Sequence, residues 1–228
     1  MNASEPLVTV SEALARYGRG RVLLHGPPGT GKTAFANYVA RTLDRPLLLK
    51  RASDIFDMWL GESEKNARRM FEEAYREAAV LFLDEADSVL RGREGGVGRW
   101  EAPVVNEILT GMERFSGVFI CATNLLDVLD VASLRRFTFK IRFGWLNREQ
   151  RWRLLLETFA AISSEATEDD RTRAAQLLAE LDALAPGDFA IVSEREQLGM
   201  QFESLEAIVA ALAVEQSHKP GSRRGIGF

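Results

Sequence analysis

The chain has 228 residues, 46% of them hydrophobic, so it is long and apolar enough to form a globular core without disulfide support. Its formal net charge of −4 argues against a surface built mainly to bind phosphate backbones, so nucleic acid is not the expected partner, although this balance does not exclude a local basic patch. The single cysteine excludes an internal disulfide, no apolar run is long enough to span a bilayer, and residues 1–5 lack the features of a signal peptide, so we expect a cytoplasmic protein.

Residues 1–25 predict a short helix followed by a strand. Ser11 is the expected N-cap of a helix that continues to Tyr17, and the glycines at positions 18 and 20 are typical of its end. The apolar run Arg21–His25 is typical of a buried strand.

A glycine-rich stretch, Gly26–Thr33, follows this strand and fits the phosphate-loop template G-x-x-x-x-G-K-[ST] at every fixed position. Its glycines let backbone N–H groups turn toward phosphate oxygens, and the helix expected after it directs a positive dipole end at them. We expect Lys32 to reach the outer phosphates and the Thr33 hydroxyl to be a Mg²⁺ ligand. The alternative is a Gly-Pro turn that Lys-Thr follows by chance. The residues expected to bind the nucleotide are Pro28, Gly29, Thr30, Gly31, Lys32 and Thr33.

Four more apolar runs predict strands, and the segments between them have helical periodicity. The expected strands are 46–51, 79–83, 118–123 and 139–143, and the expected helices include 34–43, 62–77 and 100–114. Strands that alternate with helices form parallel sheets with helices on both faces. We therefore predict an α/β fold with a five-stranded parallel sheet in a phosphate-loop domain over residues 1–146.

The pattern changes from residue 147 onward, where helical spacing replaces strand-like runs. Three apolar stripes predict a small all-helical lid domain over residues 147–228, which ends in a tail without periodicity. The stripes are Trp152, Leu155, Leu156 and Phe159; Leu177, Leu178, Leu181 and Leu184; and Phe202, Leu205, Ile208, Val209 and Leu212.

Two acidic residues, Asp84 and Glu85, follow directly after the expected strand 79–83. A carboxylate at the carboxyl edge of a parallel sheet can hold a metal beside the phosphate loop, so we expect Asp84 to bind Mg²⁺ through water. Glu85 would accept a proton from the water that attacks the terminal phosphate. Alternatively, the pair begins a helix, since Asp and Glu also favour that position. The complete phosphate loop favours the catalytic interpretation.

These segments resemble the AAA family of ATPases, and the resemblance extends from about Gly20 to the last expected helix. Gly26–Thr33 resembles the family's Walker A motif, and Leu81–Asp87 resembles its Walker B motif. Ala122–Asn124 is similar to the sensor-1 segment, which implies that Asn124 positions the attacking water.

The stretch Leu129–Phe137 is similar to the family segment that carries arginine fingers. This resemblance implies that Arg135 and Arg136 reach the γ-phosphate in the site of the neighbouring subunit. Fixed cations there would stabilise the charge that develops on the transferred phosphoryl group. Taken alone, an exposed surface pair would be the simpler interpretation.

Met58–Glu64 resembles the pore-loop-1 signature of the family, in which an aromatic residue, a hydrophobic residue and glycine precede Glu-Ser-Glu. The resemblance implies that Trp59, Leu60 and Gly61 line a central channel and grip an extended polypeptide. Stacking on substrate side chains would explain an exposed tryptophan. The alternative is a core tryptophan beneath the next helix. Residues 91–100 take the place of the second pore loop or form an ordinary surface loop.

The chain departs from the family pattern in three places. Only 25 residues precede Gly26, so the segment that helps to enclose the adenine is short or missing. The nearest counterpart of the sensor-2 turn, residues 186–190, supplies Gly187 near the adenine but no arginine for the phosphates. Thr138 stands where the family usually has aspartate.

The expected function is that of a Mg²⁺-dependent ATPase that assembles with itself into a ring, expected to be a hexamer, and remodels, unfolds or threads a protein substrate. Its cofactors are ATP and Mg²⁺, and its partner is a protein substrate or an adaptor. One alternative is a DNA-acting loader or helicase motor, which the acidic balance and Trp59–Gly61 disfavour. Another is a signalling switch that binds ATP with low turnover, and the presence of Glu85 counts against it.

Overall fold

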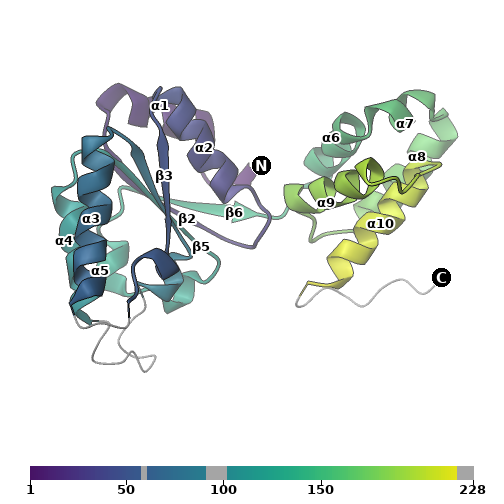
Figure 1. Ribbon diagram of the computed structural model, residues 1–228. Coiled ribbons are helices and arrows are strands. Elements are labelled where there is room, and N and C mark those ends of the chain that lie inside the picture. The colour runs from purple at the N-terminus through teal and green to yellow at the C-terminus, as the bar shows by residue number, and fades with distance from the viewer. Residues whose placement is uncertain (58–60, 91–101, 220–228) are drawn as a thin grey trace. The chain divides into compact units, whose positions relative to one another are not determined.

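The computed structural model of the chain describes residues 1–57, 61–90 and 102–219 (Figure 1). The chain divides into two compact units. The α/β unit contains Ala3–Gly26 and Lys32–Phe143, and the helical unit contains Gly144–Phe228 together with Met1–Asn2 and Pro27–Gly31. None of the described helices combines the length and apolar composition that a bilayer crossing requires.

The sheet has six strands in the order β1-β6-β2-β5-β4-β3. Every neighbouring pair among β2 to β6 is parallel, which confirms the predicted α/β class. The expected number of five strands was wrong, because β1 is only two residues long and so short a strand has no apolar alternation to reveal it. The strands are β1 (Asn2–Ala3), β2 (Gly20–His25), β3 (Leu47–Arg51), β4 (Val80–Asp84), β5 (Val118–Thr123) and β6 (Phe139–Gly144).

Helices cover both faces of the sheet, as predicted (Figure 1). Successive strand residues point to opposite faces, so an entirely buried strand such as β5 contributes to two cores. One core includes Leu23, Phe119, Met70 of α3 (Glu62–Arg76) and Ile108 of α4 (Ala102–Arg114). The other core includes Val22, Ile120, Leu14 of α1 (Leu7–Tyr17) and Phe35 of α2 (Lys32–Thr42).

Helix α1 begins earlier than predicted. It starts at Leu7 with Pro6 at the N-cap position, so Ser11 lies inside the helix and is not its N-cap. The Ser11 side chain is fully buried, and its hydroxyl donates a hydrogen bond of 2.7 Å to the carbonyl of Val8, which satisfies it within the helix. The predicted end is correct, because Gly18 adopts a left-handed conformation with φ 63°.

The helical unit contains five helices after β6 within the described residues (Figure 1). They are α6 (Arg148–Thr158), α7 (Ala160–Glu165), α8 (Glu168–Ala179), α9 (Pro186–Gln197) and α10 (Leu205–Ser217). Their shared core includes Leu155, Leu178, Phe189 and Leu212. The side chain of Asn147 caps α6 by accepting a hydrogen bond from the backbone N–H of Gln150. The first helix of this region therefore begins at a capping residue.

Candidate active site

The phosphate loop connects β2 to α2 and depends on glycine at three positions. Gly26, Gly29 and Gly31 have φ values of 133°, 74° and 102°, which side-chain-bearing residues rarely adopt. A Cβ atom on Gly26 would also lie 2.0 Å from the carbonyl oxygen of Phe143. The loop is further braced by Thr30, whose hydroxyl donates a 2.7 Å hydrogen bond to the carbonyl of Pro27. Its backbone therefore has the glycine-dependent shape that a phosphate cradle requires.

Lys32 directs its ammonium group toward the end of β5. Its Nζ donates hydrogen bonds of 2.7 Å to the carbonyl of Gly26 and to Oδ1 of Asn124. The side chain is only 8% exposed, and burial lowers its pKa, while the nearby carboxylates of Asp84 and Asp87 oppose this shift. The cation is thus held beside the loop and close to the acidic residues that follow β4.

Asp84 is the last residue of β4, and Glu85 follows it in a tight turn. Oδ1 of Asp84 accepts a 2.9 Å hydrogen bond from the backbone N–H of Glu85. Glu85 itself has φ 55° and ψ 41°, a left-handed conformation that is unfavourable for a residue other than glycine. Glu85 is exposed, so its carboxylate is accessible to water.

The parallel register brings the ends of three neighbouring strands together. His25 of β2 pairs with Thr123 of β5, and Leu83 of β4 pairs with Cys121 of β5. The residues that follow these strands, including Lys32 and Asn124, therefore meet at one edge of the sheet, as a parallel sheet predicts. The contact between Lys32 and Asn124 joins two residues that the sequence analysis assigned to different motifs.

Two polar residues at this edge were not identified from the sequence. The Thr123 hydroxyl donates a 2.6 Å hydrogen bond to Oδ1 of Asp87 and accepts one of 2.9 Å from the N–H of Leu125. Thr123 could have been recognised in the sequence, because it is the only residue with a hydroxyl group in the otherwise apolar strand β5. The signal for Asp87 was its position two residues after Glu85.

The two predicted arginine fingers have different environments. Arg136 donates through Nε to Glu113 of α4 at 2.7 Å and through Nη1 to the carbonyl of Ala132 at 2.8 Å. Arg135 follows α5 (Val131–Leu134) and is exposed. Arg135 is therefore accessible to a second subunit, whereas Arg136 would first have to leave its ion pair.

Gly187 contacts the phosphate loop within the helical unit. Its N–H donates a 2.9 Å hydrogen bond to the carbonyl of Gly29. A Cβ atom on Gly187 would lie 3.0 Å from the Cα of Gly29, so the two backbones approach closely because both residues are glycine. The contact links Gly187 to the loop, and its expected role at the adenine stays a prediction.

Comparison with known proteins assigns most of the α/β unit to a family. A family model described as "ATPase family associated with various cellular activities (AAA)" matches residues 22–145, which is more than half of the chain. The chain belongs to the AAA family of ATPases. The expected class of enzyme, an ATPase that binds nucleotide, is thereby confirmed at the level of the family.

Known AAA proteins match over the same region. The chain is 40% identical over 144 residues to an ATP-dependent zinc metalloprotease FtsH of Marinobacter nauticus, covering 59% of this chain and 23% of the relative. It is 39% identical over 141 residues to a cell division cycle protein 48 homolog of Archaeoglobus fulgidus, covering 59% of this chain and 19% of the relative. The chain thus spans about a fifth of the length of these curated relatives.

The fold also matches a solved AAA structure. The FIGL-1 AAA domain in complex with ADP superposes with a TM-score of 0.62 at 22% identity, and the match covers 92% of this chain and 74% of that domain. This likeness extends the fold assignment beyond the residues that the family model matches.

Members of the AAA family are expected to use Mg²⁺, and the predicted ligands have oxygen donors suited to it. Thr33 and Asp84 supply a hydroxyl and a carboxylate, and Mg²⁺ commonly takes one or two protein ligands and completes its shell with water and phosphate oxygens. Within the described residues there is no cluster of three or more His, Cys, Asp and Glu side chains that could hold a metal alone. The residues present therefore fit a metal shared with a bound nucleotide.

The predicted pore residues Trp59 and Leu60 lie outside the described residues, and so does the expected second pore loop at 91–100. Both ends of the first segment are described. The N–H of Asp57 donates a 2.9 Å hydrogen bond to Oγ of Ser63, and Gly61 is the N-cap of α3 with φ 83°. The described residues on the two sides of positions 58–60 are therefore joined by this hydrogen bond.

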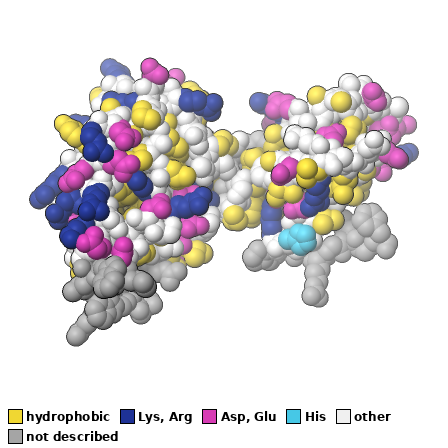
Figure 2. Space-filling model, in the orientation of Figure 1, with side chains coloured by type: hydrophobic (Ala, Val, Ile, Leu, Met, Phe, Trp, Pro, Cys, Tyr) yellow, Lys and Arg dark blue, Asp and Glu magenta, His cyan; other side chains and the backbone are white. Residues whose placement is uncertain are grey.

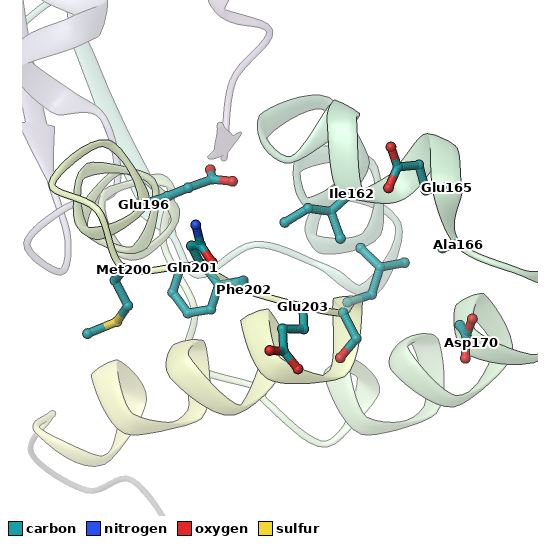
Figure 3. A pocket seen from close by; sticks show the side chains of 11 residues that line it. Ile162, Glu165, Ala166, Asp170, Glu196, Met200, Gln201, Phe202 and Glu203 are labelled. Atoms are coloured by element: carbon teal, nitrogen blue, oxygen red, sulfur yellow. The ribbon is translucent and has the colours of Figure 1, made fainter.

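A separate cavity of about 510 Å³ lies in the helical unit, between the ends of α7 and α9 and the start of α10 (Figure 3). Phe202, Ile162 and Leu205 contribute apolar surface, while Glu196 and Glu203 contribute carboxylates. None of the predicted site residues lines this cavity. It is distinct from the AAA motifs.

Proposed function

We propose that the chain is the motor module of a Mg²⁺-dependent ATP hydrolase that forms a ring, expected to be a hexamer, and remodels, unfolds or threads a protein substrate through its central pore. The observation that carries the hydrolytic part is the contact of Lys32 with Asn124 beside the acidic turn at Asp84 and Glu85. A phosphate-binding cation, a polar amide and an exposed carboxylate thus meet at one sheet edge. These are the groups that phosphoryl transfer to water needs.

The chemistry follows from the position of each group. Backbone N–H groups of the phosphate loop bind the phosphates, and Lys32 exchanges its bonds to Gly26 and Asn124 for the outer phosphate oxygens. Asn124 is then free to orient a water molecule, and Glu85 accepts the proton of that water. Thr33 and Asp84 would hold Mg²⁺, whose positive charge would offset the negative charge of the phosphates.

Ring formation is proposed because the site would be completed by a neighbour. Arg135 is exposed, and the α/β unit therefore offers a cation to a second subunit. A guanidinium that reaches the γ-phosphate stabilises the charge of the transition state. Hydrolysis would then depend on assembly.

A protein substrate is favoured over nucleic acid by three observations. Trp59 belongs to a segment similar to the family's first pore loop, and the described residues on either side of it, Asp57 and Ser63, are joined by a hydrogen bond. One relative is named an ATP-dependent zinc metalloprotease, a protein that acts on proteins. Acidic and basic side chains are interspersed over the face of the α/β unit that Figure 2 shows, in keeping with the net charge of −4. We propose a cytoplasmic location on the composition alone.

The proposal is tested by measuring ATP turnover and assembly together. We expect Mg²⁺-dependent turnover that rises with protein concentration, and further stimulation by an unstructured protein such as casein. Sedimentation with ATP should show a ring-sized species of the Glu85→Gln variant. Turnover that is stimulated by single-stranded DNA and not by casein would favour the loader or helicase alternative.

A further inference from the structure

A hydrogen bond joins the ends of β4 and β5 beyond the last residues that pair in the ladder, Leu83 and Cys121. The Thr123 hydroxyl donates it to Oδ1 of Asp87 at 2.6 Å. Asp87 lies in the short 3-10 turn η2 (Ala86–Ser88), and Thr123 is only 1% exposed. A short, partly buried bond from a hydroxyl to a carboxylate is among the stronger hydrogen bonds in proteins.

The same hydroxyl shapes the turn that presents Asn124. Its oxygen accepts a 2.9 Å hydrogen bond from the N–H of Leu125, so the backbone closes around the residue between them. Asn124 in turn directs its amide oxygen to Nζ of Lys32. The orientation of Asn124 therefore depends on where the Thr123 hydroxyl is fixed.

The other end of the bond stabilises the turn that contains Glu85. The N–H of Ser88 donates a 2.9 Å hydrogen bond to the carbonyl of Glu85, and this turn encloses Asp87. Glu85 occupies a left-handed conformation, which persists only where surrounding contacts impose it. Anchoring Asp87 to Thr123 supplies such a contact.

We propose that Asp87 and Thr123 are positioning residues, which hold Glu85 and Asn124 in the relative arrangement that hydrolysis requires. The proposal rests on the proposed function, because it takes Glu85 and Asn124 to act on the attacking water. Neither Asp87 nor Thr123 needs to touch the nucleotide. They act by fixing the two turns that follow β4 and β5.

Substitution of Thr123 gives the cleanest test, because Asp87 also acts on the charge of Lys32. Thr123→Val removes the hydroxyl and keeps the branched shape, whereas Thr123→Ser keeps the hydroxyl. We expect the valine variant to lose about 10–100-fold in kcat, the scale of a small misplacement of reacting groups, with nucleotide affinity in equilibrium titration nearly unchanged. The serine variant should recover most of the lost turnover.

A second readout does not depend on activity. The N–H of Leu125 should exchange slowly with solvent in the wild type and in Thr123→Ser, and faster in Thr123→Val, because only the valine variant lacks its acceptor. Thermal melting of both variants checks that the fold is retained. A loss of affinity in parallel with turnover would assign the bond a merely structural role.

The outcomes separate this proposal from the proposed function. If the wild type hydrolyses ATP and Thr123→Val is equally active, the positioning role is wrong and the ATPase stands. If the wild type does not hydrolyse ATP, the proposed function fails, and the positioning role fails with it whatever the exchange of Leu125 shows.

Discussion

Nζ of Lys32 donates a 2.7 Å hydrogen bond to Oδ1 of Asn124, a residue 92 positions away in the chain. The bond links the start of α2, which follows β2 and the phosphate loop, to the residue after β5. β2 and β5 are neighbouring parallel strands, so the bond lies at their carboxyl ends. Because a bound phosphate would compete for the same ammonium group, occupancy of the loop and release of Asn124 become coupled. The site can thus respond to nucleotide before any reaction takes place.

Substitution of Lys32 and substitution of Asn124 should have different effects. Lys32→Met removes the cation that binds phosphate, so we expect equilibrium titration to show a large loss of ATP affinity. Asn124→Ala should retain binding but lose about 10²–10³-fold in turnover, the usual effect of removing one group that stabilises the reacting centre. Lys65→Met, which removes an exposed lysine of α3, is the matched control. Normal affinity of the Lys32 variant would contradict the phosphate-loop assignment.

Much of the fold was predictable because its signals are local. The strands β2 to β6 are apolar runs between helical stretches, and the predicted bounds differ from the observed ones by a residue or so. The start of α1 was not predictable from Ser11, because that hydroxyl is satisfied inside the helix by Val8. The two-residue β1 had no pattern of its own.

The sequence proposed the residues of the candidate site but did not predict their contacts. Motif spacing identified Lys32 and Asn124 separately, and a parallel sheet implied that they share an edge. The bond between them depends on register and on rotamers, which sequence spacing does not encode. The same holds for the ion pair of Arg136 with Glu113, which joins the turn after α5 to α4.

The arginine prediction is tested by mixing inactive variants. A Glu85→Gln subunit keeps its arginines, and an Arg135→Ala/Arg136→Ala subunit keeps its own phosphate loop and Glu85. We expect each alone to lose turnover, by about 10³–10⁵-fold for the arginine variant, and mixtures to recover activity at mixed interfaces. If the mixtures recover no activity and turnover does not depend on protein concentration, both arginines are ordinary surface residues.

The pore-loop prediction is tested by Trp59→Ala. A tryptophan that grips substrate can be removed without loss of folding or of basal ATP turnover, while stimulation by casein should disappear. If Trp59 were a core residue, its replacement by alanine would instead reduce stability by about 3–5 kcal/mol. Thermal melting detects such a loss without any substrate. Ser63→Ala, which removes the acceptor of the Asp57 N–H, should reduce stimulation in the same assay but less completely.

His25 should make stability depend on pH. Burial lowers its pKa, and the neighbouring cations Arg142 and Lys32 lower it further, while Asp127 opposes them. The folded chain therefore takes up this proton at lower pH than the unfolded chain, whose histidine titrates at about 6.5. Stability should be full above that pH and decline as the pH falls through it toward the lower folded pKa.

The measurement for this prediction is the melting midpoint as a function of pH. The wild type should lose more stability than His25→Gln on acidification from about pH 7.5 to about pH 5.5, because only the wild type gains this proton on unfolding. Parallel curves for the two proteins would show that the environment of His25 does not disfavour its charged form.

The most direct test of the account is the ATP turnover of Glu85→Gln, measured together with its affinity for ATP. Glu85 is exposed at the end of β4 and held in a left-handed turn, so the amide should replace the carboxylate with little effect on the fold. We predict that ATP affinity is retained and that turnover falls by about 10²–10⁴-fold, the contribution of a general base. Glu77→Gln, at the exposed end of α3, should keep full turnover. Near-normal hydrolysis by Glu85→Gln would contradict the proposed mechanism.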